Sequence, residues 1–365
     1  MKIAAAIAWE QDAPLIIEDV ELDPPRADEI LVKIKAVGIC HTDLNVIRQQ
    51  FPLPLPMILG HEGAGVVESV GANVHGVKPG DRVGLTFDSC GTCRFCQAGE
   101  PAYCAEQAAR NFTGLRADGS TKARKDGTPI RANFFAQSSF ATYALAHERN
   151  VVKVPDGVPL EIVGPLGCGI MTGAGAVMNA LKVQAGQSIA VLGAGAVGLS
   201  AVMAARLVGA SVIIAVDVHA HRLALAQELG ATHAIDATDG AEIEPKLRAI
   251  TGGNLDFVAD TTGVGTVIRQ AVQALATRGT CGLIGSLRGD PGLNFRDLMG
   301  RGKTVRGIID GDSIPGLFIP RLIEYQQRGQ FPFDRLVREY PFGSINEAIA
   351  DTTAGRTIKP VLVMP

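Results

Sequence analysis

A glycine-rich turn constrains the fold of this chain more than any other feature of its sequence. The pattern G-x-G-x-x-G occupies residues 193–198, directly after the predicted strand Ser188–Leu192 and at the start of a predicted helix. In that context Gly193 permits a tight turn, Gly195 lets the backbone approach a pyrophosphate, and Gly198 packs the helix against the strand. The motif predicts a dinucleotide site; a glycine turn that serves only packing is the alternative.

The residues around this turn alternate between strand and helix patterns. Strands joined by crossover helices form a parallel, doubly wound sheet, so the fold class is α/β with a six-stranded Rossmann-type cofactor domain. Helical segments separate the first five of the predicted strands, which are Ser188–Leu192, Val212–Asp217, His233–Asp236, Leu255–Asp260, Thr280–Ile284 and Thr304–Ile309.

An acidic residue stands at the end of the strand that follows the glycine turn. Asp217 is placed there to bind an adenosine ribose 2'-hydroxyl. A carboxylate at that position repels a 2'-phosphate, so the sequence predicts NAD rather than NADP. Arg222 is expected either to flank the same ribose or to be a solvated charge on a helix.

Residues 3–155 have a different pattern, in which short β-type runs lie between Gly, Pro and Asp residues. Such spacing predicts an irregular antiparallel β-barrel. The polar, glycine-containing residues 105–133 are expected to form a long surface excursion. Beyond Ile309 the sequence predicts a helix at Ile319–Arg328 and a closing strand at Val361–Met364. The β-type runs are Leu15–Leu22, Glu29–Val37, Gly63–Val70, Asp81–Leu85 and Phe140–Ala146.

The length and hydrophobic content of the chain indicate two domains. At 365 residues it exceeds one typical domain, and its 47% hydrophobic residues can fill two cores. We expect a discontinuous catalytic domain at residues 1–165 plus 310–365, and a cofactor domain at residues 166–309.

The charge balance argues against two classes of partner. Lys and Arg number 34 against 37 Asp and Glu, a net charge of -3, so the sequence predicts no surface for nucleic acid or anionic membrane.

The longest apolar run, Ile189–Ala205, contains glycines and reads as strand, turn and helix rather than a membrane span. Ile3–Trp9 is too short for a signal-peptide core. We therefore expect a cytoplasmic protein with a small-molecule partner.

Seven cysteines in a reducing compartment indicate metal binding rather than disulfides. Four thiolates close together can complete a tetrahedral zinc site. An iron–sulfur cluster is the alternative, but its pattern requires a three-residue gap and a following proline, whereas the gap here is seven residues and Ala105 follows. The four cysteines, with spacing C-x2-C-x2-C-x7-C in a lobe at residues 88–106, are Cys90, Cys93, Cys96 and Cys104.

A second group of potential ligands lies nearer the N-terminus, in an otherwise apolar region. A thiolate, imidazoles, a hydroxyl and carboxylates within one short stretch suit a zinc site with a proton path attached. A buried cysteine beside surface polar residues explains the same stretch without a metal. The residues are Cys40, His41, Thr42 and Asp43, followed by His61 and Glu62.

Together these motifs make the chain resemble the zinc-dependent medium-chain alcohol dehydrogenases over essentially its whole length. Phe134–Phe140 and Gly164–Gly173 look most like the aryl-alcohol branch, which acts on benzyl, cinnamyl and monoterpene alcohols. The resemblance implies that the barrel is a GroES-like catalytic domain. It rests on motif order as well as content: Gly38–Asp43, Gly60–Gly65, the four-cysteine lobe, Gly167-Cys168-Gly169 and Gly193–Gly198.

The resemblance implies a catalytic zinc held by Cys40, His61 and Cys168, with the fourth position open to water or substrate. Without the resemblance, Cys168 reads as a packed cysteine between two glycines. Glu62 is implied to lie behind the metal. Asp43 is implied to accept a hydrogen bond from His61, which orients the imidazole ring and raises its basicity.

The same resemblance implies a route for the alcohol proton. Thr42 fits the hydroxyl that takes this proton while hydride passes to the nicotinamide. Many relatives continue the relay to a histidine, but the corresponding residue here is Asn45, which cannot serve as a base. The proton then leaves through the cofactor ribose and water, or through His41, although the family pattern more often places His41 against the pyrophosphate.

Three further cofactor contacts are implied by the family pattern. Lys359 is expected to be a second pyrophosphate cation, with an ordinary surface lysine as the alternative. Thr172 and Val197 are expected to contact the nicotinamide.

The substrate pocket is implied at Leu85, Thr86 and Phe134, where Phe134 either stacks on an aromatic or allylic substrate or belongs to the core.

The sequence thus predicts an NAD-dependent enzyme with one catalytic and one structural zinc that interconverts primary aromatic or allylic alcohols and aldehydes. The alternatives are a glutathione-dependent formaldehyde dehydrogenase, which shares these motifs, and a non-catalytic zinc-binding module. Hydrophobic residues expected to be exposed near Ile314–Ile323 indicate a homodimer or homotetramer.

Overall fold

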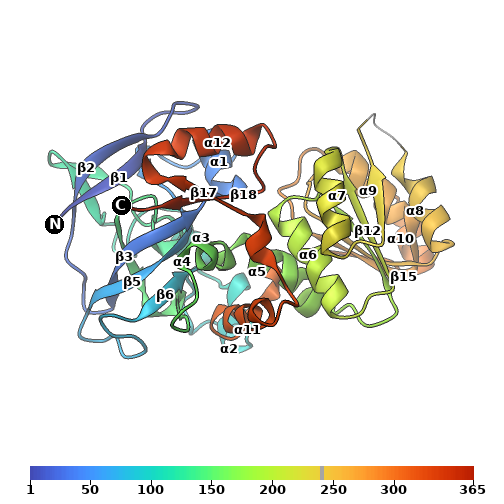
Figure 1. Ribbon diagram of the computed structural model, residues 1–365, viewed down its shortest axis with the longest axis horizontal. Helices are drawn as coiled ribbons and strands as arrows, with labels where there is room; N and C mark the ends of the chain where they lie inside the picture. The colour runs from blue at the N-terminus through green and yellow to red at the C-terminus, as the bar shows by residue number, and fades with distance from the viewer. Residues whose placement is uncertain (239–241) are drawn as a thin grey trace. The chain divides into compact units, whose positions relative to one another are not determined.

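The computed structural model describes residues 1–238 and 242–365, and the chain divides into two compact units (Figure 1). The division differs from the expected one chiefly at Glu324–Phe333, which clusters with the second unit instead of staying with residues 310–365. The first unit comprises Met1–Cys168, Ile314–Ile323 and Asp334–Pro365, and the second comprises Gly169–Ser313 and Glu324–Phe333.

Two sheets form most of the first unit. The smaller has the strand order β4-β1-β2-β7-β8, and the larger has the order β10-β6-β5-β3-β18-β17, with β9 paired to β3. All pairs are antiparallel except β17 with β18, and the expected curled antiparallel domain is confirmed. The strands are β1 (Lys2–Ala8), β2 (Ile16–Leu22), β3 (Glu29–Gly38), β4 (Met57–Ile58), β5 (Glu62–Val70), β6 (Arg82–Leu85), β7 (Ala123–Lys125), β8 (Thr128–Ile130), β9 (Tyr143–His147), β10 (Val151–Lys153), β17 (Val337–Pro341) and β18 (Lys359–Val363).

The central strand of the larger sheet positions the candidate ligands. β3 pairs with β5 along one edge, while β9 and β18 share its other edge. The β3–β5 register sets Gly38 opposite Glu62. Because Cys40 lies just beyond the end of β3 and His61 just before the start of β5, this antiparallel register brings the two residues to the same end of the sheet.

The second unit contains a six-stranded parallel sheet with the order β13-β12-β11-β14-β15-β16, as the sequence predicts. The order reverses between β11 and β14, so right-handed crossovers place helices on both faces. Ligands of such sheets bind at the carboxyl ends of the strands where the order reverses, and the glycine turn follows β11. The strands are β11 (Ser188–Leu192), β12 (Val212–Asp217), β13 (His233–Asp236), β14 (Leu255–Asp260), β15 (Leu275–Leu283) and β16 (Thr304–Gly307).

Helices cover this sheet in pairs, with α6 beside α7 and α8 beside α9 (Figure 1). The core between α8, α9 and the sheet is aliphatic and includes the fully buried Leu247, Ile268 and Cys281. The helices are α5 (Gly169–Gly175), α6 (Ala196–Leu207), α7 (Ala220–Leu229), α8 (Ile243–Thr251), α9 (Gly265–Ala274), α10 (Phe295–Arg301) and α11 (Pro315–Gln327), of which α11 begins in the first unit.

The longest apolar run forms β11, the glycine turn and α6, as expected from its glycines. Within residues 1–238 and 242–365 no single helix has the length and apolar composition to cross a membrane, although the bent pair Leu160–Gly167 and Gly169–Ala180 meets those two criteria together.

The expectation of a surface excursion at residues 105–133 is wrong for its central part. The β7–β8 hairpin adds to the edge of β2, and Arg116 and Lys122 are buried. The Arg116 guanidinium donates to both carboxylate oxygens of Glu29 at 2.7 and 3.0 Å, and the Lys122 ammonium donates to the backbone carbonyls of Ala136 and Leu145. Their polar sequence signalled solvent, but long side chains can be buried when their charged ends are hydrogen-bonded.

Lys122 predicts a pH dependence of unfolding. Burial lowers the pKa of its ammonium to about 8, from the ordinary 10.5. The unfolded chain therefore binds more protons than the folded chain between pH 8 and 10.5, and stability rises with pH across that window. We expect Lys122→Met to remove up to about 3 kcal/mol of this rise. Denaturant unfolding followed by Trp9 fluorescence measures it, since Trp9 is the single tryptophan and lies in the first unit. The exposed Lys78→Met is the control, and an unchanged rise in Lys122→Met would contradict the expectation.

Candidate active site

A buried carboxylate ties together the two segments that carry the candidate ligands. Cys40 is the N-cap of α1 (His41–Ile47), and Asp43 Oδ2 accepts the Cys40 N–H at 3.0 Å. Asp43 Oδ1 accepts from the Gly60 N–H and lies 3.0 Å from His61 Nδ1. Asp43 is fully buried, so one side chain fixes both the start of α1 and the residues that lead into β5.

The imidazole of His61 is held so that one nitrogen is left to ligate a metal. A proton on Nδ1 is directed at Asp43, which leaves a lone pair on Nε2. His61 Nε2 is buried and has no hydrogen-bond partner among the described residues. Phe135 stacks on the ring at 4.4 Å, and Phe134 meets it edge-on at 5.5 Å. A buried ring nitrogen without a partner is costly, and a metal ion removes that cost.

His61 is one of four potential metal donors that lie close together. Ligand atoms of Cys40, His61, Glu62 and Cys168 all lie within 4.8 Å of one another. The sulfurs of Cys40 and Cys168 are 3.9 Å apart, although 128 positions separate the residues in sequence. Two thiolates bound to one tetrahedral zinc at about 2.3 Å lie about 3.8 Å apart, so the donor set fits zinc in chemistry and in spacing.

The loop that carries Cys168 is fixed by contacts with Leu85 and Thr86. The hydroxyl of Thr86 donates to the Gly167 carbonyl at 2.7 Å, and a Cβ on Gly167 would lie 2.0 Å from the Leu85 carbonyl oxygen. Leu85 and Thr86, both predicted to line the substrate pocket, are fully buried. Thr86 therefore holds the loop before Cys168 in place, a contact that the sequence did not indicate.

A strained segment brings the two phenylalanine rings to His61. Phe135, Ala136 and Ser138 all have positive φ values, of 49°, 56° and 53°, which is unfavourable for residues with a Cβ. Such strain persists only where surrounding contacts fix it, and it concentrates at functional sites. The sequence predicted Phe134 as a pocket residue, but Phe135, which stacks directly on the imidazole, was missed.

The amide of Gln137 supplies those fixing contacts. Its Nε2 donates to the carbonyls of His61 and Thr86 at 2.9 and 3.1 Å. Its Oε1 accepts from the Gly63 N–H at 3.1 Å and from the Ser139 hydroxyl at 2.6 Å. A buried amide with all four bonds satisfied rigidifies its surroundings, and this one joins the strained segment to β5 and to the end of β6.

Thr42 lies next to the candidate metal donors, and the other residues predicted for the cofactor and the proton path have different surroundings. The Thr42 hydroxyl is 3.8 Å from the Cys40 sulfur. His41 is exposed at the start of α1, and Asn45 is half-buried on the same helix. Lys359, expected at a cofactor phosphate, is 3% exposed, and its ammonium donates to both oxygens of Glu62 at 2.8 and 2.9 Å.

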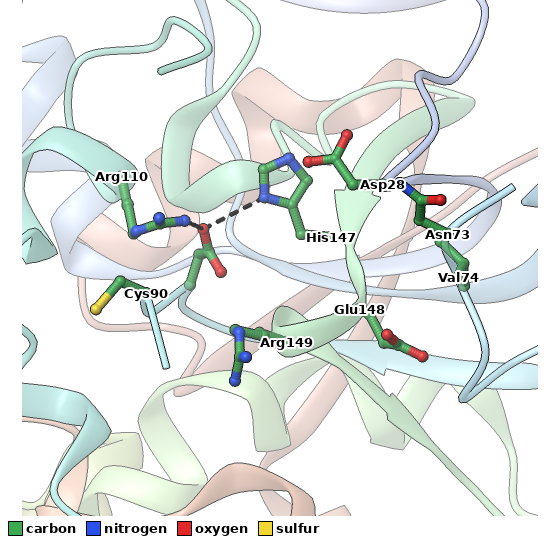
Figure 2. Close-up of a pocket in the computed structure, with 9 residues that line it drawn as sticks. Asp28, Asn73, Val74, Cys90, Arg110, His147, Glu148 and Arg149 are labelled. Atoms are coloured by element: carbon green, nitrogen blue, oxygen red, sulfur yellow. Dashed lines mark hydrogen bonds and ion pairs between the residues drawn. The ribbon is translucent and has the colours of Figure 1, made fainter. Parts of the chain in front are cut away.

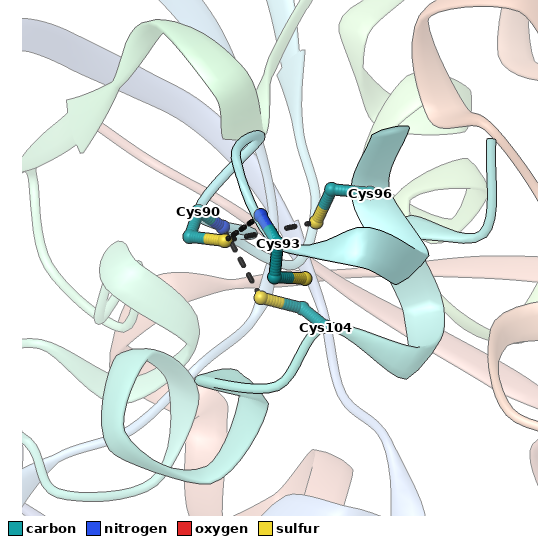
Figure 3. Close-up of side chains that lie close together, drawn as sticks. All are labelled: Cys90, Cys93, Cys96 and Cys104. Atoms are coloured by element: carbon teal, nitrogen blue, oxygen red, sulfur yellow. Dashed lines mark hydrogen bonds between the residues drawn. The ribbon is translucent and has the colours of Figure 1, made fainter. Parts of the chain in front are cut away.

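The four cysteines of the lobe form the second group of metal donors (Figure 3). Their sulfurs lie within 4.8 Å of one another, and those of Cys90 and Cys96 are 3.9 Å apart. Hydrogen bonds from Thr92 and from the Cys93 N–H lower the pKa of the Cys90 thiol to about 6, which favours the thiolate that a metal requires. With four protein donors the lobe has no open position, so it suits a structural zinc.

A polar hollow of about 500 Å³ lies beside this lobe, with Cys90 on its wall (Figure 2). Asp88 Oδ2 accepts from Arg110 at 3.0 Å and lies 3.4 Å from His147 Nδ1. The Asp88 backbone N–H and carbonyl both bond the Asn111 amide, at 2.8 and 3.0 Å. These bonds join Asp88, the first residue of the lobe, to Arg110 and Asn111, which follow its end, so they hold the two ends of the lobe together.

The glycine turn of the second unit has the geometry of a dinucleotide site. Gly193 has φ +89°, and a Cβ on Gly198 would lie 1.8 Å from the Gly193 carbonyl oxygen. A Cβ on Gly195, the N-cap of α6, would meet no atom within 4 Å, so the backbone there is open to a ligand. The turn thus has the tight backbone, the close helix packing and the open approach that a pyrophosphate requires.

Asp217 lies at the end of β12 beside this turn. Its Oδ2 accepts the Ala194 N–H at 2.6 Å, and its Oδ1 accepts the His219 N–H at 2.9 Å. Burial raises the pKa of the carboxyl, but these bonds and the charge of Arg222 hold it below its usual range. Asp217 is therefore a carboxylate at neutral pH. Thr172 on α5 and Val197 on α6 lie on helices that pack closely, since a Cβ on Gly173 would lie 2.0 Å from the Val197 carbonyl oxygen.

Comparisons with known proteins identify the class. The model of the alcohol dehydrogenase GroES-like domain matches residues 26–156, and that of the zinc-binding dehydrogenase matches residues 196–322. The chain is 47% identical to geraniol dehydrogenase of Castellaniella defragrans over 98% of its own length and 97% of that protein.

Solved structures agree with this result. The crystal structure of benzyl alcohol dehydrogenase from Acinetobacter calcoaceticus has a TM-score of 0.96 and 44% identity, with both chains fully covered. The crystal structure of an alcohol dehydrogenase zinc-binding domain protein from Burkholderia ambifaria has a TM-score of 0.97 and 51% identity, over 100% of this chain and 99% of that one. The chain belongs to the zinc-dependent medium-chain alcohol dehydrogenases and is an oxidoreductase, which confirms the family predicted from its motifs.

Asp43→Asn should weaken metal binding at His61. The amide keeps the shape of the carboxylate but loses its charge, so the imidazole is less basic and less firmly oriented. Loss of such a partner typically weakens metal affinity about 10–100-fold. Chelator competition followed with a metallochromic dye measures the effect. Asp260→Asn, which changes a buried acid of the second unit, is the control. Equal metal affinity in Asp43→Asn and the parent would contradict the role given to Asp43.

Proposed function

We propose that this enzyme oxidises primary aromatic or allylic alcohols of the benzyl, cinnamyl or monoterpene type to aldehydes, with NAD as the hydride acceptor. Cys40, His61 and Cys168 would hold the catalytic zinc, and Cys90, Cys93, Cys96 and Cys104 would hold a structural zinc. The observation that carries the proposal is the buried, unpartnered Nε2 of His61 facing two sulfurs that are 3.9 Å apart. Zinc bound there would lower the pKa of a coordinated alcohol.

The substrate class is supported by the relatives and by the aromatic residues near His61. One relative is a geraniol dehydrogenase and another a benzyl alcohol dehydrogenase. Phe134 and Phe135 surround the imidazole, and planar π-systems pack well against aromatic rings. The strained but firmly bonded segment 134–138 gives such a wall a fixed shape.

A substrate panel tests the proposal. Geraniol, cinnamyl alcohol and benzyl alcohol should have kcat/KM values above that of ethanol, with NAD as cofactor. S-hydroxymethylglutathione belongs in the same panel, because preferred turnover of that compound would favour a glutathione-dependent formaldehyde dehydrogenase. Metal content without any nicotinamide binding would instead favour a non-catalytic zinc-binding module.

The cofactor preference rests on the Asp217 carboxylate. A 2'-phosphate placed against it meets like-charge repulsion, whereas a ribose hydroxyl donates to it. We expect Asp217→Ser to raise the ratio of kcat/KM with NADP to kcat/KM with NAD at least about tenfold, which corresponds to about 1.4 kcal/mol. Arg222, on the same side, would support the ribose. An unchanged ratio of kcat/KM with NADP to kcat/KM with NAD in Asp217→Ser would contradict this role of Asp217.

Thr42 would take the alcohol proton. Its hydroxyl is 3.8 Å from the Cys40 sulfur, so it lies beside the proposed metal position. We expect Thr42→Ala to lower kcat about 10²–10⁴-fold and to change the pH-rate profile, while Thr42→Ser keeps most of the rate. His41 and Lys359 were expected at the pyrophosphate, and His41 remains the proposed contact there. A Thr42→Ala profile that matches the parent in rate and pH dependence would rule out the hydroxyl.

We also propose a cytoplasmic homodimer or homotetramer. None of the seven cysteines is in a disulfide, as suits a reducing compartment. Phe295 and Met299 on α10 are 77% and 80% exposed, and α10 directly precedes β16, an edge strand of its sheet. Within the segment Ile314–Ile323, expected to expose its hydrophobic residues, Leu317 is 71% exposed, but Phe318, Ile319, Leu322 and Ile323 are buried, so the expectation is wrong for most of that segment. Light scattering after size exclusion would distinguish monomer, dimer and tetramer.

A further inference from the structure

A buried ion pair lies directly behind the proposed catalytic metal position. Lys359 is the first residue of β18, Glu62 is the first residue of β5, and both belong to the first unit. The ammonium donates to both Glu62 oxygens and, at 3.1 Å, to the carbonyl of Ile39, the residue before Cys40. The two side chains are 3% and 0% exposed, so water does not screen the pair.

The carboxylate of Glu62 is close enough to compete for the metal. One of its oxygens belongs to the same four-donor group as Cys40, His61 and Cys168, within 4.8 Å of each. Carboxylate oxygens are ordinary zinc ligands, and a fourth protein ligand closes a zinc site to substrate. A dehydrogenase therefore needs something that keeps Glu62 from becoming that ligand.

Two features of the structure restrain the carboxylate. The first is the ammonium of Lys359, which engages both oxygens and neutralises their charge. The second is the niche left by a glycine: a Cβ on Gly38 would lie 2.0 Å from Glu62 Oε2. The ammonium and the niche hold the carboxylate at β3, and the bond to the Ile39 carbonyl fixes the ammonium beside the ligand Cys40.

We propose that Lys359 is a positioning residue that keeps Glu62 off the catalytic zinc, so that the fourth coordination position stays open for the alcohol. The proposal rests on the zinc site proposed above. It gives Lys359 a different role from the expected pyrophosphate contact, and the two roles predict different measurements. Without the ammonium, the buried carboxylate is still within reach of the metal position, and its coordination would close the site.

Cobalt exchanged into the catalytic position reports the coordination directly through its visible spectrum. In the parent, imidazole added as an external ligand should bind the metal and shift the spectrum. In Lys359→Met, Glu62 should occupy the fourth coordination position of the cobalt. The cobalt spectrum before imidazole is added should then differ from that of the parent, and the affinity for imidazole should fall at least about tenfold. Lys359→Met/Glu62→Gln should restore imidazole binding, because the amide is a poor zinc ligand. The NAD dissociation constant of Lys359→Met, by fluorescence titration, should equal that of the parent.

Two further variants keep the test decisive. Lys303→Met removes another buried lysine, in the second unit, and should leave the cobalt spectrum unchanged. Gly38→Ala fills the niche that holds the Glu62 carboxylate while Lys359 stays in place, so this variant should also bind imidazole more weakly. Adding Glu62→Gln should restore imidazole binding. The Gly38 variants test the proposal even if Lys359→Met does not fold.

The proposal is overturned if Lys359→Met binds imidazole as the parent does, if Glu62→Gln gives no rescue in either background, or if the NAD dissociation constant rises while the cobalt spectrum stays the same. That last outcome would return Lys359 to the cofactor phosphate. A parent that binds no metal through Cys40, His61 and Cys168 would instead overturn the proposed function itself.

Discussion

The Asp43 carboxylate is the interaction on which the rest of the first unit's chemistry depends. It accepts hydrogen bonds from the Cys40 and Gly60 N–H groups and is paired with His61 Nδ1. One buried charge therefore positions both Cys40 and His61, the two proposed metal ligands, and sets the tautomer of the second. Such a charge is stable in a core only because every bond it requires is made.

Around that carboxylate, polar side chains fix the backbone segments of the site, and an aromatic ring covers the His61 imidazole. Gln137 joins the strained segment to the backbone of His61, and Thr86 holds the loop before Cys168. Phe135 covers the face of the imidazole. These groups come from distant parts of the chain, and the β3–β5 register brings Cys40 and His61 to them at one end of the sheet. The site is accordingly a property of the folded sheet and not of any one segment.

Much of this architecture could be predicted from the sequence because its signals are local. The glycine turn, the alternating strands and the four clustered cysteines each need only a short stretch to be recognised. Cys168 was different, since a cysteine between two glycines carries no sign of a metal, and only the family pattern implied that it is a ligand. The 3.9 Å separation of the Cys40 and Cys168 sulfurs supplies the geometric support that the sequence lacked.

Other residues could not be assigned from the sequence because their roles depend on distant partners. Lys359 looks like a surface or phosphate-binding lysine until β18 pairs with β3 and brings it to Glu62. Arg116 and Lys122 lie in a polar stretch that predicts solvent, yet Glu29 and two backbone carbonyls are their partners. Phe135 and Gln137 have ordinary residue types, and only the positive φ values at Phe135, Ala136 and Ser138 make their role visible.

Zinc K-edge X-ray absorption on the protein as isolated tests the central claim most directly, because it counts the metal and reads its ligands together. The account predicts two zinc ions per chain, with an average shell of about three sulfurs at about 2.3 Å and one nitrogen or oxygen at about 2.0–2.1 Å. A single zinc per chain with four sulfurs would contradict it, because the Cys40, His61 and Cys168 site would then hold no metal.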